Sequence, residues 1–96
     1  MASSKNFKDY VLEQLRLLDD VSYRSMMGEF LLYYHGKLFG GIYDDRFLVK
    51  PTSTNQKFNL TTVIPYPHAK PMYFIENVDD AESLQEIVKA TCDGLK

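Results

Sequence analysis

Four short runs of β-favouring residues follow one another in the middle of the chain, at 21–27, 30–35, 38–43 and 46–50. About two residues separate each run from the next, at 28–29, 36–37 and 44–45. Connections this short join only antiparallel neighbours, because a parallel crossover needs about a dozen residues or more. The spacing therefore predicts a meander of antiparallel hairpins.

One helix is predicted before this meander. Apolar residues recur at helical spacing between Phe7 and Leu18, so we expect a helix over about 5–18. Ser3 or Ser4 is available as its N-cap, because a serine hydroxyl can accept a hydrogen bond from a free backbone N–H of the first turn.

A second helix is predicted at the C-terminal end, after a fifth strand at 71–76. Asp79 is the expected N-cap and Glu82 occupies the third helical position, which is the spacing of a capping box. Gly94 is placed to end this helix. The intervening residues 51–66 are rich in Thr, Asn and Pro and are expected to form a long surface loop.

The fold class follows from these elements and from the length. Ninety-six residues suffice for one compact core, so we expect a single domain over 1–96 with disordered tips at about 1–4 and 94–96. No crossover helices are available, which favours an α+β fold. We expect a two-layer sandwich in which the N- and C-terminal helices pack on one face of an antiparallel meander sheet.

Alternation along the strands sorts their side chains onto two faces. With two-residue turns at 36–37 and 44–45, the face that the helices must cover holds Leu31, Tyr33, Leu38, Ile42, Phe47 and Val49. The opposite face holds Phe30, Leu32, Tyr34, Phe39, Tyr43, Arg46, Leu48 and Lys50. The same register places Arg24 on the apolar face, so either a bulge at Gly28 turns that strand over or Arg24 has a carboxylate partner.

The chain has seven tyrosines, six phenylalanines and no tryptophan. Several of these aromatic residues fall on the second face, which has no helix to cover it. An apolar patch rimmed by Lys and Arg is typical of a contact site. We therefore expect a homodimer or protein-partner interface, formed by Phe30, Tyr34, Phe39, Tyr43, Arg46 and Lys50. The alternative is that the 51–66 loop folds across this face. Gly40 and Gly41 lie within the third strand, where they indicate either aromatic packing or a close backbone approach by a ligand.

Charge is unevenly distributed. Residues 21–70 carry six Lys or Arg against three Asp or Glu, and the net charge of the chain is −2. Arg24 and Lys70, lying among tyrosines, are candidates for binding an anion or single-stranded nucleic acid. An ordinary solvated β-surface explains the same residues, and the net charge makes nucleic acid a less favoured partner.

Catalytic and metal-binding patterns are missing from the sequence. His35 and His68 have no Cys, Asp or second His at metal-ligand spacing, and the Asp pairs lie at turns or caps. We expect neither an enzyme nor a cofactor or metal. The single cysteine, Cys92, cannot form an internal disulfide, and no run resembles a signal peptide or a membrane span, so we expect a cytoplasmic protein without a membrane partner.

Several short motifs in combination resemble the N-terminal domain of the TfoX (Sxy) family, bacterial regulators of competence for DNA uptake. These motifs are Tyr23-Arg24-Ser25-Met26-Met27-Gly28, Tyr34-x-Gly36-Lys37, Gly41-Ile42-Tyr43-Asp44, Leu48-Val49-Lys50 and Lys70-Pro71-Met72. The resemblance covers about residues 5–92 and implies an α+β sandwich with an antiparallel sheet. Two-domain members carry a second, helical domain, and this chain ends at Lys96, so we expect a stand-alone member.

These observations together favour a small intracellular regulatory or protein-interaction module that acts as a dimer. The resemblance implies no catalytic residues, and stand-alone members are generally of unassigned function. The alternative is a binder of a small anionic ligand or single-stranded nucleic acid through the basic aromatic face.

Overall fold

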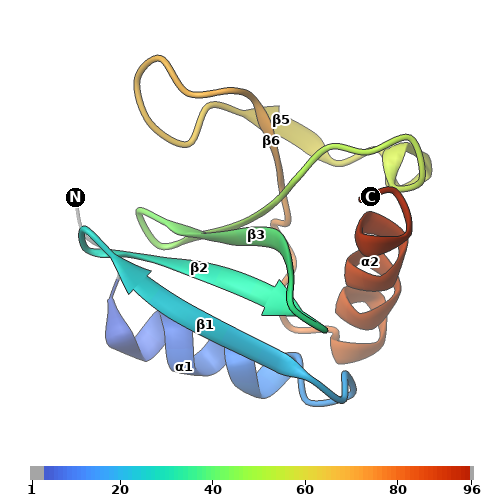
Figure 1. Cartoon of the computed structure of the whole chain (residues 1–96), viewed down its shortest axis with the longest axis horizontal. Helices are drawn as coiled ribbons and strands as arrows, with labels where there is room; N and C mark the ends of the chain where they lie inside the picture. Colours follow the sequence, from blue (N-terminus) through green and yellow to red (C-terminus); the bar gives the residue numbers. More distant parts are fainter. Residues whose placement is uncertain (1–3, 96) are drawn as a thin grey trace.

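A computed structural model describes residues 4–95 and shows an α+β fold built on one antiparallel sheet (Figure 1). The strand order is β1-β2-β3-β4-β6-β5, so the first four strands form the predicted meander. The strands are β1 (Val21–Met26), β2 (Glu29–Tyr34), β3 (Lys37–Tyr43), β4 (Arg46–Val49), β5 (Thr61–Val63) and β6 (Met72–Phe74). The helices are α1 (Lys5–Gln14), the short 3₁₀ helix η1 (Gln56–Phe58) and α2 (Ala81–Asp93).

Helix α1 begins after Ser4, whose hydroxyl accepts a hydrogen bond of 3.1 Å from the backbone N–H of Phe7. Ser4 is thus the N-cap, while Ser3, the other candidate, lies outside the described residues. The helix is capped at Leu15, earlier than predicted, although Leu18 beyond it is still buried in the core. The apolar spacing therefore extends past the helix into the turn that leads to β1.

Helix α2 begins one residue later than predicted. Asp80 is the N-cap and accepts hydrogen bonds from the backbone N–H groups of Glu82 and Ser83. Asp79 instead accepts a hydrogen bond from the hydroxyl of Tyr10, which ties this end of α2 to α1. The prediction of Asp79 as the cap was wrong because two adjacent aspartates offered the same chemistry.

Gly94 caps α2 at its C-terminal end, as predicted, but its φ of −90° is not left-handed. A glycine is needed there for space instead. A Cβ at this position would lie 2.5 Å from the Thr54 hydroxyl oxygen and 2.6 Å from the Thr52 Cβ. The loop after β4 therefore packs directly onto the end of α2, and Leu95 beyond it packs against the core.

Both helices share one core with the sheet. Figure 1 shows α1 beneath β1 and β2, and α2 beside the start of β3. The buried cluster joins side chains of both helices to one face of the sheet: Val11, Leu15, Leu18, Leu32, Phe39, Ile42, Phe47, Val49, Ile75, Leu84, Ile87, Val88 and Cys92. Of the tips expected to be disordered, Ser4 caps α1, Gly94 caps α2 and Leu95 packs against the core, while residues 1–3 and 96 lie outside the described residues.

The three hairpin turns consist of residues with positive φ. They are Met27-Gly28 (+52° and +85°), His35-Gly36 (+51° and +78°) and Asp44-Asp45 (+54° and +57°). This backbone matches the twist of the flanking strands. The last turn lies where it was predicted, and so does the β3–β4 register, with Tyr43 opposite Arg46 and Ile42 opposite Phe47. The first two turns lie one residue earlier than predicted.

An irregularity in β3 changes the sorting of the two faces. Tyr33 pairs with Leu38 but Leu32 pairs with Gly40, so Phe39 is one extra residue in β3. One extra residue turns β2 over relative to β3 and β4. The face predicted for the residues of β2 and for Phe39 was therefore wrong, while the face predicted for Tyr43, Arg46, Leu48 and Lys50 was right. Phe30, Leu32, Tyr34 and Phe39 lie on the helix side. Tyr43, Arg46, Leu48 and Lys50 lie on the far face, now joined by Leu31, Tyr33 and Leu38.

Arg24 is exposed on the same far face, opposite Leu31. The conflict over this residue is resolved without a bulge at Gly28 or a carboxylate partner, because the extra residue at Phe39 turns β2 over, and β1, which pairs with β2, turns with it.

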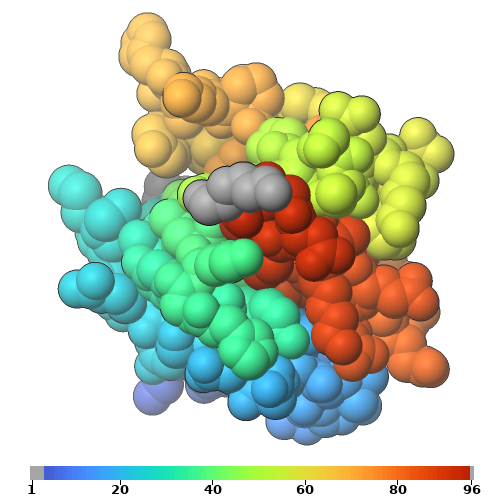
Figure 2. All heavy atoms as spheres, turned by 45° about the vertical axis from the view of Figure 1, so that its right-hand side comes forward, coloured from blue at the N-terminus to red at the C-terminus, as the bar shows by residue number. Residues whose placement is uncertain are grey.

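The segment expected as a long loop contains structure of its own. It includes η1 and the edge strand β5, which pairs with β6, so that β6 lies between β4 and β5. The chain between β5 and β6, residues 64–71, projects from the body of the molecule (orange in Figure 2), as does the β1–β2 hairpin (cyan).

Candidate functional site

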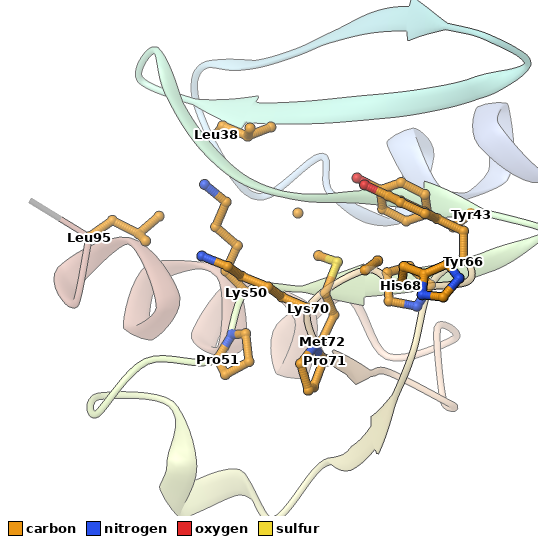
Figure 3. A pocket seen from close by; sticks show the side chains of 13 residues that line it. Leu38, Tyr43, Lys50, Pro51, Tyr66, His68, Lys70, Pro71, Met72 and Leu95 are labelled. Carbon is orange, nitrogen blue, oxygen red and sulfur yellow. The ribbon is translucent and has the colours of Figure 1, made fainter.

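A pocket of about 630 Å³ lies beside β3 and β4, under the 64–71 segment and next to the end of α2 (Figure 3). We call it the basic pocket. Its lining consists of Leu38, Gly40, Tyr43, Lys50, Pro51, Pro65, Tyr66, His68, Ala69, Lys70, Pro71, Met72 and Leu95. The volume falls within the range of about 300–1,000 Å³ that is usual for small-molecule sites.

Arg46 holds one wall of the basic pocket in place. Its guanidinium donates a hydrogen bond of 3.1 Å to the carbonyl of Pro65 and another of 3.3 Å to the carbonyl of Tyr43. The 64–71 segment is tightened further by a turn in which the Ala69 N–H donates to the Tyr66 carbonyl at 3.0 Å. Arg46 therefore donates to backbone carbonyls and positions the 64–71 segment against the sheet.

Two tyrosines form one end of the basic pocket. The rings of Tyr43 and Tyr66 lie 6.1 Å apart, centre to centre, at an angle of 46°. The Tyr43 ring fits because Gly41 has no side chain: a Cβ there would lie 2.9 Å from the ring. Burial, together with the neighbouring Tyr66, raises the pKa of Tyr43, so its hydroxyl remains a neutral hydrogen-bond donor.

The charged groups in the lining all belong to basic residues. Lys50 and Lys70 contribute ammonium groups, and no aspartate or glutamate is among the lining residues. Lys50 lies just beyond β4, where its backbone N–H bonds to the Phe39 carbonyl at 2.8 Å. His68 adds an imidazole from a backbone with φ of +69°, an uncommon conformation for a residue other than glycine.

The structure brings together part of the predicted site. Tyr43 and Lys50, predicted as interface residues, and Lys70, predicted as an anion ligand, line the basic pocket, and Arg46 supports its wall. Arg24, the other predicted anion ligand, lies on the edge strand β1 and is not among the lining residues.

The other predicted interface residues face the helices. Phe39 is fully buried, with its ring edge-on to Phe47 at 6.5 Å. Phe30 packs partly buried against the core, near Tyr23 at 5.9 Å. Tyr34 also packs against the core and donates a hydrogen bond of 3.2 Å to Asp19. Phe39 thus belongs to the core, while Phe30 and Tyr34 are half-buried on the helix side of the sheet.

The sequence did not predict that two of the lining residues, Tyr66 and His68, belong to the same site. The signal that could have found them is the run Ile64-Pro-Tyr-Pro-His-Ala-Lys-Pro71, in which three prolines restrict a loop that carries two aromatic rings and a lysine. Asn55 was also missed. It is completely buried, and its role is purely structural.

A second cluster lies at the turn of the β2–β3 hairpin. The imidazole of His35 donates from Nε2 to a carboxylate oxygen of Asp19 at 2.9 Å, and Asp20 lies 3.9 Å from Nδ1. The hydrogen bond from His35 lowers the pKa of Asp19. All three side chains are largely exposed, which is typical of a surface contact, and this contact joins the segment between α1 and β1 to the β2–β3 turn.

Among residues 4–95, no group of three or more His, Cys, Asp or Glu side chains is arranged to hold a metal ion. Neither of the α-helices in that range is long and apolar enough to cross a bilayer.

A comparison with protein families assigns the chain. The profile of the TfoX N-terminal domain matches residues 13–94. The chain belongs to the TfoX N-terminal domain family. A family relative, the uncharacterized 12.7 kDa protein in the trpE 5′ region of Spirochaeta aurantia, is 31% identical over 98 residues, covering 99% of this chain and 85% of the relative. Membership of the TfoX N-terminal domain family indicates a competence-regulator-like module.

Proposed function

We propose that this chain is a small cytoplasmic regulatory module that acts through protein contacts and not through catalysis, and that it pairs with a second copy of itself through β1. The observation that supports the proposal is the exposed outer edge of β1, where residues 22–26 are all exposed. An edge strand of six residues without proline is a template for pairing with another strand.

The backbone groups of β1 that face outward follow from its pairing with β2. The N–H of His35 bonds to the carbonyl of Asp20 at 3.0 Å, which makes Asp20 and His35 a hydrogen-bonded pair. Hydrogen-bonded and non-bonded pairs alternate along an antiparallel ladder. The N–H and C=O groups of Val21, Tyr23 and Ser25 therefore point away from β2 and are free to pair with another strand.

The side chains of β1 also favour a contact. The run that carries the family resemblance includes Arg24, Met26 and Gly28. Gly28 has a φ of +85°, so the backbone of the turn requires a glycine there, but the turn does not require Arg24 or Met26. Met26 is 49% exposed and Met27 at the hairpin tip is 96% exposed, while Arg24 is exposed beside them. Exposed methionines are typical of adaptable protein-binding surfaces. The packing of this chain gives no other reason for these side chains.

A second copy suits this edge because β1 is compatible with itself. In an antiparallel register centred on Tyr23, the outward-facing Val21 of one copy lies opposite Ser25 of the other. The same register places Arg24 opposite Ser22, so the two guanidinium groups do not meet. Such a two-fold contact closes on itself and gives a dimer, not a filament.

The test compares two substitutions at one position of β1. Ser25→Pro removes an outward-facing N–H without removing a bond to β2, while Ser25→Ala keeps that N–H. We expect light scattering coupled to size exclusion to show a dimer for the native chain and Ser25→Ala, and a monomer for Ser25→Pro. Circular dichroism should show that all three remain folded. A native chain that remains monomeric up to millimolar concentration contradicts the proposal, as does a dimer that Ser25→Pro leaves intact.

A further inference from the structure

Among residues 4–95, the basic pocket is lined by ammonium groups and by no carboxylate. Within residues 4–95, neither Lys50 nor Lys70 forms an ion pair, although both line the same cavity. Figure 3 shows their side chains reaching toward one end of the pocket, near Leu38 and Leu95. Two unpaired ammonium groups converging on one cavity without a carboxylate form an anion-binding arrangement.

The other end of the basic pocket is suited to a flat apolar group. Figure 3 places Tyr43 and Tyr66 there, with His68 beside them and Met72 in the floor. Offset or tilted aromatic rings bind a third flat ring well, and a methionine adapts to its shape. The neutral hydroxyl of Tyr43 supplies a hydrogen-bond donor at this end.

The wall of the basic pocket is held before any ligand arrives. Pro65, Pro67 and Pro71 restrict the backbone of the 64–71 segment, and Arg46 anchors it through the Pro65 carbonyl. Less ordering is then required on binding, which raises affinity for a small ligand.

We propose that the basic pocket binds a small organic anion that joins a flat aromatic group to one phosphate or carboxylate. The anionic group lies between Lys50 and Lys70, and the aromatic group lies against Tyr43 and Tyr66. This role is independent of pairing through β1, because Lys50, Lys70 and both tyrosines lie outside that strand.

A small ligand fits these observations better than a nucleic-acid strand. A strand needs a basic groove that follows several phosphates, together with a row of stacking platforms. The basic pocket offers two lysines and two tyrosines at one place, on a chain whose net charge is −2. Its volume of about 630 Å³ lies within the range that is usual for small-molecule sites.

The experiment uses three probes that share one ring system: 1-naphthyl phosphate, 1-naphthylacetate and the uncharged 1-naphthol. Binding is measured by calorimetry and by NMR shifts of the Tyr66 and Met72 signals. We expect one site per chain for at least one of the two anions, with 1-naphthol about tenfold weaker. A stronger response to the phosphate or to the acetate identifies which anionic group the pocket prefers.

The matched variants are Lys50→Met with Lys70→Met, and Lys57→Met as the control, because Lys57 lies on η1 outside the lining. We expect the double variant to bind the anion about tenfold more weakly, while the control binds like the native chain. Tyr66→Ala should weaken the binding of all three probes alike, because they share the ring system that lies against Tyr66. The variant should remain folded, because Tyr66 is 58% exposed and its removal does not open the core.

Three results would overturn the proposal. One is a double variant that remains folded and binds the anions with native affinity, and another is equal binding of 1-naphthol and both anions. The third is an oligothymidylate that binds more tightly than either anion with a salt dependence of several phosphates, which would assign the basic face to single-stranded nucleic acid. The Ser25→Pro chain should bind the probes like the native chain, so a failure of dimer formation is distinguishable from a failure of this proposal.

Discussion

Asn55 and Thr91 are joined by a buried hydrogen bond of 2.8 Å, which the Asn55 amide donates to the threonine hydroxyl. The same amide donates to the Lys50 carbonyl at 2.8 Å, and its oxygen accepts from the Thr52 N–H at 2.9 Å. Thr91 in turn donates to the Ile87 carbonyl within α2 at 2.7 Å. One completely buried side chain thus fixes the loop after β4 onto α2 and places Lys50 at the basic pocket.

Replacing this amide should be costly. Asn55→Ala removes three hydrogen bonds and leaves the Thr52 N–H and the Lys50 carbonyl without their partner. We expect the free energy of unfolding to fall by about 3 kcal/mol, since each unsatisfied buried group costs about 1–3 kcal/mol. Urea unfolding followed by circular dichroism measures the change. The neighbouring exposed Gln56→Ala is the control, and an equal loss in both variants would contradict this role of Asn55.

The sequence predicted most of the fold because local chemistry determines most of it. The Asp44-Asp45 turn was correct because two aspartates tolerate the positive φ that a two-residue hairpin needs. The register of β3 with β4 then followed by counting. The bulge at Phe39 was missed, although Gly40-Gly41 in mid-strand is a signal for such an irregularity. That one residue explains why the aromatic rings of β2 were placed on the wrong face.

The candidate site was only partly predictable, because it is assembled by contacts between distant segments. Tyr43 and Lys50 were named from alternation along β3 and β4, which local pairing decides. Tyr66 and His68 reach the same pocket only because Arg46 binds the carbonyl of Pro65, nineteen residues further along the chain. No periodicity in the sequence encodes that contact.

The two types of glycine in β3 and its turn should respond differently to a methyl group. A Cβ at Gly40 would lie 2.1 Å from the Leu48 carbonyl oxygen and 2.8 Å from the Val49 Cα, so the paired backbones would have to separate. We expect Gly40→Ala to lower the free energy of unfolding by about 3 kcal/mol. Gly36 has φ of +78° and open space around it, so Gly36→Ala should cost about 1 kcal/mol from backbone strain alone. Chemical unfolding of both variants checks the order, and a larger loss for Gly36→Ala would refute it.

The contact between Asp19 and His35 should make stability depend on pH. The hydrogen bond from His35 lowers the pKa of Asp19 in the folded state below that of the unfolded chain. A lowered carboxyl pKa stabilises the fold above the unfolded pKa of about 4, and this contribution is lost as the pH falls through the folded value. We therefore expect Asp19→Asn to be less stable than the native chain at neutral pH and equally stable well below pH 4.

Unfolding in urea at neutral and at acidic pH measures this difference. Glu86→Gln is the control, because Glu86 is an exposed carboxylate of α2 for which no hydrogen bond or ion pair is found within residues 4–95. Its effect on stability should be small and similar at both pH values. An Asp19→Asn deficit that persists unchanged in acid would mean that the carboxylate charge is not the cause.

The guanidinium of Arg46 should control the mobility of the basic pocket more than the stability of the fold. Arg46→Met keeps the aliphatic stem but loses the hydrogen bonds to the Pro65 and Tyr43 carbonyls. Because the bond to Pro65 joins the 64–71 segment to β4, we expect the Ala69 amide to exchange with solvent faster while the core amides keep their protection. Native-state hydrogen exchange by NMR measures both. Arg16→Met removes an exposed arginine just after α1 that, within residues 4–95, bonds to Glu13 and Gln14, and it should leave the exchange of Ala69 unchanged. If Arg46→Met accelerated exchange throughout the sheet, Arg46 would be stabilising the fold as a whole and not positioning the pocket wall.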